Sequence, residues 1–138
     1  MVIYSDSLIY LDFDSQTDIL WVKWPHLVNE PLEIARPAID KIIETIKHFQ
    51  VSKLLIDTKD TSTNIPEEDF KILAREFVLS LATSNLKKVA RVIYAEPRRE
   101  LRAKILLDQL AVWLTPDFQS REFTDIKSAF AWLESDEN

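Results

Sequence analysis

The sequence predicts an α/β domain with one mixed, mostly parallel sheet and an antiparallel N-terminal hairpin. Three observations lead to this prediction: apolar runs of strand length, segments with apolar residues every three or four positions, and regular alternation of the two after residue 33. The expected order is β-β-α-β-α-β-α-β-α, with four helices. We expect residues 1–138 to form a single domain, with a frayed tail at 134–138.

The first two predicted strands form the hairpin. Residues 8–13, Leu-Ile-Tyr-Leu-Asp-Phe, precede a polar turn at 14–18, and residues 19–24, Ile-Leu-Trp-Val-Lys-Trp, follow it. Both alternating sets of side chains in the second strand are apolar. This pattern predicts a strand inside the sheet, covered on both faces.

The next two segments form a parallel crossover. From Glu33 to Gln50, apolar residues recur at helical spacing, which predicts a helix packed on the sheet. Proline is tolerated only in a first turn, so Pro37 predicts either a helix that begins within 33–36 or a kink. The apolar run at 53–57, Lys-Leu-Leu-Ile-Asp, is typical of a buried parallel strand.

The second half repeats this alternation. Pro66 opens a helix whose apolar face runs to Leu81, and a strand follows at 89–94. Pro97 opens a longer helix that ends near Leu114. We assign its apolar positions to Leu101, Ile105, Leu106, Leu110 and Trp113. A short strand at 119–123 leads to Asp125, a good N-cap, and to the final helix.

Composition excludes several classes of protein. The chain has no cysteine for disulfides, thiolate metal sites or nucleophiles, and no glycine for Walker-type or Rossmann-type phosphate loops, so we expect no cofactor. The formal net charge of −6 argues against nucleic acid as a partner. Since no stretch approaches the ~20 uncharged apolar residues of a membrane span, we expect a soluble cytoplasmic protein.

The chain resembles STAS-like domains, the fold of the anti-sigma-factor antagonists, and in particular their small-protein branch related to lipid-binding CRAL-TRIO domains. The resemblance covers nearly the whole chain. It depends on the hairpin strand 19–24, on Leu-Leu-Ile-Asp at 54–57, and on the closing segment 123–133. It implies a non-enzymatic domain that binds a kinase-like protein partner under the control of serine phosphorylation.

The family's phosphorylation motif is missing here. Where the family has Asp-Ser-Ser-Gly, residues 64–69 read Asn-Ile-Pro-Glu-Glu-Asp, with carboxylates in place of hydroxyls. The nearest hydroxyls are earlier in the loop, so the candidate phosphorylation sites are Thr61, Ser62 and Thr63. With no histidine nearby in the sequence, these hydroxyls lack a base for nucleophilic catalysis.

Two carboxylates follow the strand at 53–57. Asp57 and Asp60 could form a phosphoacceptor or magnesium site, since paired carboxylates attract hard cations. Alternatively, Asp57 accepts backbone N–H bonds and caps the loop. The candidate partner-binding residues of this loop are Asp57, Thr58, Asp60, Thr61, Ser62 and Thr63.

Arg98 and Arg99 complete the candidate binding site. Both open the third helix, where guanidinium groups near a helix N-terminus favour an anion or acidic partner. The alternative is a solvated helix face paired with neighbouring glutamates. His26 and His48 have no cluster of acids around them, so we expect no metal site.

The four tryptophans allow a second function. Trp21, Trp24 and Trp113 could line an apolar cavity between sheet and helices, which would make the protein a small-molecule or lipid carrier. They could equally be core residues, as could Trp132. The leading hypothesis is an interaction domain that binds a protein partner or its own copy through the loop at 58–64 and the adjoining helices.

Overall fold

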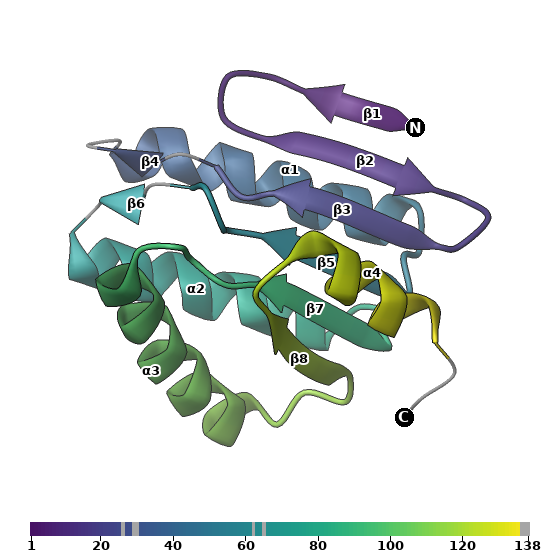
Figure 1. The fold of residues 1–138 in the computed structure, drawn as a ribbon. Helices are drawn as coiled ribbons and strands as arrows, with labels where there is room; N and C mark the ends of the chain where they lie inside the picture. The colour runs from purple at the N-terminus through teal and green to yellow at the C-terminus, as the bar shows by residue number, and fades with distance from the viewer. Residues whose placement is uncertain (26, 29–30, 62, 65, 136–138) are drawn as a thin grey trace.

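The computed structural model describes residues 1–25, 27–28, 31–61, 63–64 and 66–135. Six strands form one sheet in the order β1-β2-β3-β5-β7-β8 (Figure 1). The strands are β1 (Val2–Ser5), β2 (Tyr10–Asp14), β3 (Ile19–Lys23), β5 (Lys53–Asp57), β7 (Lys88–Val92) and β8 (Gln119–Phe123). β1, β2 and β3 pair antiparallel, while β3, β5, β7 and β8 pair parallel. The predicted mixed, mostly parallel sheet is confirmed.

Four helices alternate with the strands as predicted: α1 (Leu32–His48), α2 (Glu67–Ala82), α3 (Pro97–Leu114) and α4 (Ile126–Glu134). Three elements were not predicted. β1 is a short strand added outside the hairpin, and β4 (Leu27–Val28) pairs with β6 (Thr63–Asn64) in a separate two-stranded sheet. Two-residue strands are too short to produce a periodic pattern in the sequence.

Pro37 is deeper in α1 than the sequence predicted. The helix begins at Leu32, which places Pro37 beyond the first turn. Ile34 N and Ala35 N both donate to Pro31 O and stabilise the start of the helix. The helix therefore begins one residue before the expected range of 33–36, and the alternative, a kink at Pro37, stays a prediction.

The helices cover the two faces of the sheet unequally. In Figure 1, α1 and α2 lie behind the sheet and α4 lies in front of it. Behind the sheet, side chains such as Leu20, Val22 and Leu54 pack against α1 and α2. In front, Leu55, Ala90 and Val92 pack against Ala129, Trp132 and Leu133 of α4. The nine-residue α4 leaves the front of β2 and β3 only partly covered, and this opening positions the candidate site.

Candidate functional site

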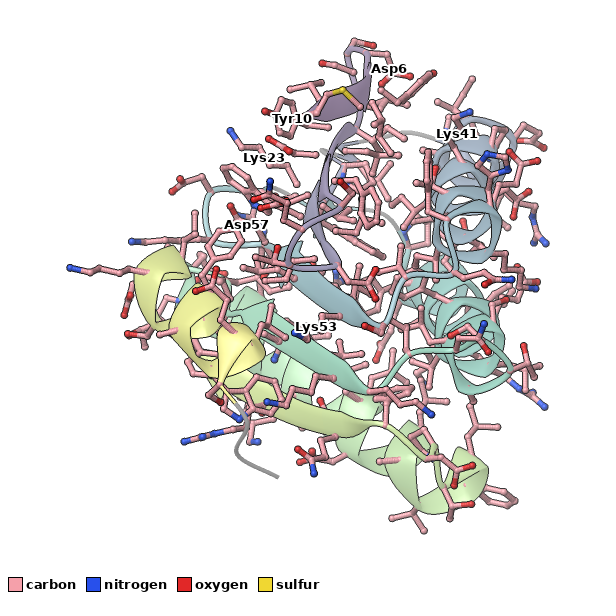
Figure 2. All side chains as sticks on the ribbon, turned by 90° about the vertical axis from the view of Figure 1, so that its right-hand side faces the viewer. Asp6, Tyr10, Lys23, Lys41, Lys53 and Asp57 are labelled. Carbon is pink, nitrogen blue, oxygen red and sulfur yellow. The ribbon has the colours of Figure 1, made fainter. Side chains whose placement is uncertain are left out.

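A groove of about 380 Å³ opens at the carboxyl ends of β3 and β5, on the side of the sheet that carries α4. This volume is within the usual range of about 300–1,000 Å³ for ligand sites. Figure 2 shows Tyr10, Lys23 and Asp57 on the same side of the sheet. The residues that line the groove are Asp6, Ser7, Leu8, Ile9, Tyr10, Trp21, Lys23, Trp24, Asp57, Asp60, Thr61 and Ile126.

Lys23 is the cation of this groove. In the sheet register it is opposite both Tyr10 and Asp57. Its Nζ is 5.2 Å from the centre of the Tyr10 ring and 5.4 Å from the Trp21 ring, which are cation–π distances. Within the described residues Lys23 forms no ion pair shorter than 4.0 Å. From the sequence, Lys23 was treated only as a member of its strand and was not named as a site residue. Its position two residues after Trp21, on the same face of the strand, was the signal that could have identified it.

Three of the predicted loop residues have structural contacts. Asp57 is buried, and its Oδ1 accepts a hydrogen bond from Lys59 N at 3.2 Å, as the loop-cap interpretation requires. Thr58 Oγ1 donates to Val92 O at 2.6 Å, and Thr61 Oγ1 donates to Trp24 O at 3.1 Å. Both threonines are buried. Phosphorylation of Thr61 stays a prediction, and it would require this loop to open first.

The other loop residues contribute less to the described site. Asp60 is exposed at the edge of the groove, beside Asp57. Thr63 belongs to β6, but its side chain is outside what the structure describes, and Ser62 and His26 are outside the described residues altogether. Among the described residues, no three His, Asp or Glu side chains are grouped so that they could hold a metal ion.

Arg98 and Arg99 are outside the groove, at the start of α3. Glu96 caps this helix, and its carboxylate accepts hydrogen bonds from Arg98 N at 3.1 Å and Arg99 N at 2.9 Å. These backbone bonds lower the pKa of Glu96 and keep a negative charge where an external anion would bind. Neither guanidinium forms an ion pair within 4.0 Å of a described carboxylate, but both attract the Glu96 carboxylate electrostatically and help to lower its pKa, in line with the predicted solvated face beside glutamates.

The start of α3 nevertheless lies next to the predicted loop. Ala95 N donates to Lys59 O at 3.0 Å, and this bond ties the residue before the helix to the loop after β5. The predicted loop and the predicted arginines are therefore neighbours around one helix start, while only the loop reaches the groove.

A buried ion network joins α3 to the sheet. Arg91 Nη1 and Nη2 bind the two carboxylate oxygens of Glu100 at 2.8 and 2.7 Å, and Nη2 also binds Glu122 at 2.8 Å. Lys104 Nζ binds the other oxygen of Glu122 at 3.1 Å. Desolvation opposes ionisation of Glu122, but Lys104 and Arg91 outweigh it and lower the pKa of this carboxyl group. The network fixes the position of α3.

The predicted tryptophan-lined cavity is formed only in part. Trp24 lines an apolar cavity of about 70 Å³ between the sheet, α2 and α3, a volume of roughly two water molecules. Trp21 is on the opposite face of the sheet, where it packs edge-on against Tyr10 and Phe130. Trp113 is 83% exposed. The groove of about 380 Å³ has both Trp21 and Trp24 in its lining, whereas Trp113 lines neither this groove nor the smaller cavity, so the predicted grouping holds for two of the three tryptophans.

The outer side of α3 is apolar and exposed. Only Ala103 and Leu106 of this helix are buried. The apolar residues that point outward are Leu101 (61% exposed), Ile105 (51%), Val112 (78%) and Trp113 (83%). The sequence had placed three of these on the packed face. That assignment was wrong because apolar residues occur around most of the helix, and the pattern alone did not identify the buried side.

No family model matches the chain, and no curated protein matches it. Among solved structures, it is similar to an uncharacterized protein of the DUF3478 family with a SpoIIAA-like fold, from Shewanella loihica PV-4. The two chains are 20% identical, the similarity covers 95% of this chain and 98% of the other, and the TM-score is 0.49.

Proposed function

We propose that this chain is a non-enzymatic interaction domain that binds a protein partner through the outward face of α3. The observation that carries the proposal is the number of exposed apolar side chains on α3: Leu101, Ile105 and Val112 share one side of the helix, with Lys104 and Asp108 among them, and Trp113 is exposed at its margin. Contiguous exposed apolar surface is uncommon on monomeric proteins and marks sites of association. Exposed tryptophan is a frequent anchor of such interfaces.

A protein suits this surface better than nucleic acid or a lipid bilayer does. The net charge of −6 repels both phosphate backbones and anionic lipid headgroups. Helices that bind membranes have lysine and arginine along a polar face and an apolar face without acids. In α3, Asp108 is 68% exposed on the same side as Leu101 and Ile105, and its carboxylate is 3.9 Å from Nζ of the exposed Lys104. An acidic group among apolar ones is typical of a protein interface with a matching cation.

The residues proposed from the sequence border this surface. Arg98 is exposed one turn before Leu101, and the loop around Lys59 is bonded to Ala95 just ahead of the helix. We therefore retain Arg98 and the loop as part of the proposed binding site. Thr58 and Thr61 support the loop from inside, since both hydroxyls are buried and hydrogen-bonded.

Substitution of Ile105 by aspartate tests the proposal. The change places a second carboxylate at the centre of the apolar face, and we expect it to abolish association because a buried unpaired charge is costly. The measurement is gel filtration of host extract in which the tagged chain is expressed at its natural level. Wild type should elute above the monomer mass and Ile105→Asp at the monomer mass.

The matched control is Leu79→Asp, which changes an exposed apolar residue of α2 (48% exposed). This control should elute like the wild type. If the wild type elutes as a monomer in fresh extract, or if both variants behave alike, α3 is not the binding surface.

A further inference from the structure

We infer that the partner on α3 is a second copy of this chain, bound so that the two α3 helices pack antiparallel about a two-fold axis. The inference rests on the proposed function and specifies the occupant of the same surface. Its basis is that the order of charged and apolar residues on the outward face of α3 is complementary to itself in an antiparallel pairing.

The complementary residues form one straight stripe. Arg98, Leu101, Ile105, Asp108 and Val112 follow one another at alternating spacings of three and four, the spacing of a helix–helix seam. All five are exposed, on the side away from the buried Ala103 and Leu106. The stripe therefore has a cation at one end, two apolar residues next to it, and an anion beyond them.

An antiparallel pairing centred at the level of Ala103 pairs the first four members of this stripe with one another. Positions 98 and 108 are equally far from 103, and so are positions 101 and 105. In that register each Arg98 faces Asp108 of the other copy, and each Leu101 packs on the other Ile105. A two-fold axis makes each contact twice, which is the rule for symmetric homodimers. A parallel pairing would place like charges together.

The last turn of α3 has a contact in the same arrangement. In this register position 109 lies opposite Pro97, the first residue of the other helix. Later residues therefore extend beyond that helix by 1.5 Å each, the rise of an α-helix per residue. Val112 continues the stripe toward the segment that precedes the second copy's helix, and Trp113, about 100° further around the helix, lies at the margin of the contact. That segment is Ala95, bonded to the loop at Lys59. The pairing thus has the most exposed tryptophan at its margin and brings in the loop that the sequence singled out.

The dimer is expected to be weak. A standard interface buries about 800 Å² on each partner, and a single helix face supplies less. We therefore expect a dimer with a dissociation constant of micromolar order that forms and dissociates with concentration.

Charge reversal tests both the partner and the register. The variants are Arg98→Asp, Asp108→Arg and the double variant, purified and followed by sedimentation velocity over a concentration series. Each single variant creates two like-charge contacts and should raise the dissociation constant at least about tenfold. A one-to-one mixture of the two single variants restores both opposite-charge contacts, so heterodimers should form near wild-type affinity. The double variant should dimerise again.

Arg75→Asp is the matched control, since it reverses an exposed charge on α2 and should leave the dimer unchanged. Circular dichroism of each variant confirms folding. The inference is overturned if the single variants dimerise like the wild type or if the mixture fails to recover. It is also overturned if the purified wild type stays monomeric while Ile105→Asp still abolishes the complex in host extract. The proposed function would stand in that case, with a different protein as the partner.

One further outcome would overturn both the inference and the proposed function. A monomeric wild type that floats with vesicles of equal parts phosphatidylcholine and phosphatidylglycerol, and loses this property on Ile105→Asp substitution, would identify a lipid surface as the occupant of α3.

Discussion

Replacement of Arg91 by alanine is expected to lower the free energy of unfolding by about 3–5 kcal/mol, the usual cost of removing one partner from a buried ion pair. Arg91 has a side chain only 9% exposed and binds both oxygens of Glu100, which is itself 14% exposed. Without the guanidinium, Glu100 keeps only the backbone N–H of Tyr94 as a close described donor, at 3.2 Å. The loss exceeds that of a surface pair because water cannot replace the missing cation.

Urea unfolding followed by circular dichroism measures this loss. Lys104→Ala is the control, because its pair with Glu122 is exposed, and it should cost only about 0.2–1 kcal/mol. The double variant Arg91→Met with Glu100→Leu should recover much of the stability, since an apolar pair has no charge to solvate. A loss for Arg91→Ala no larger than that for Lys104→Ala would contradict the buried network.

The second large effect is expected at two adjacent residues of β5. Leu54 and Leu55 are both completely buried, but Leu54 faces α1 and α2 whereas Leu55 faces α4. Each leucine-to-alanine change should cost about 2–5 kcal/mol through lost burial and a residual cavity. In a sheet covered on one face only, one of the two would be nearly neutral.

The comparison between the two variants tests whether the short α4 buries its side of the sheet. Thermal or urea unfolding of both is sufficient, with Leu101→Ala as the exposed control at dilute concentration, where we expect almost no change. A small effect for Leu55→Ala alone would mean that α4 does not cover β5 as the structure describes.

The alternation of helices and strands could be predicted because the amphipathic pattern is strong. The apolar residues at 54–56 alternate between the two faces of the sheet, and β5 is indeed buried on both. Proline at 97 and aspartate at 125 marked helix starts, since both residue types have a local backbone reason to be there. The short strands β4 and β6 could not be predicted, because two residues have no measurable period.

The candidate site was only partly predictable. The position of Asp57 at the end of a strand placed it correctly at the groove, as the topology of parallel strands requires. Its neighbour Lys23 comes from a strand 34 positions earlier, and only the register of β3 and β5 brings the two together. Likewise, the pattern of α3 did not reveal which side of the helix is packed. That side is set by the ion network in which Arg91 of β7 binds Glu100 of α3 and Glu122 of β8.

Hydroxyl-radical labelling of Trp113 tests the central claim, that the outward face of α3 is covered when the protein is in its working state. The label should react freely in a dilute purified sample, where Trp113 is 83% exposed. In fresh host extract and at high protein concentration we expect its reactivity to fall several-fold, while that of Leu79 on α2 stays unchanged. Equal labelling of Trp113 in all three conditions would contradict the account, because an interface that stays open to solvent binds nothing.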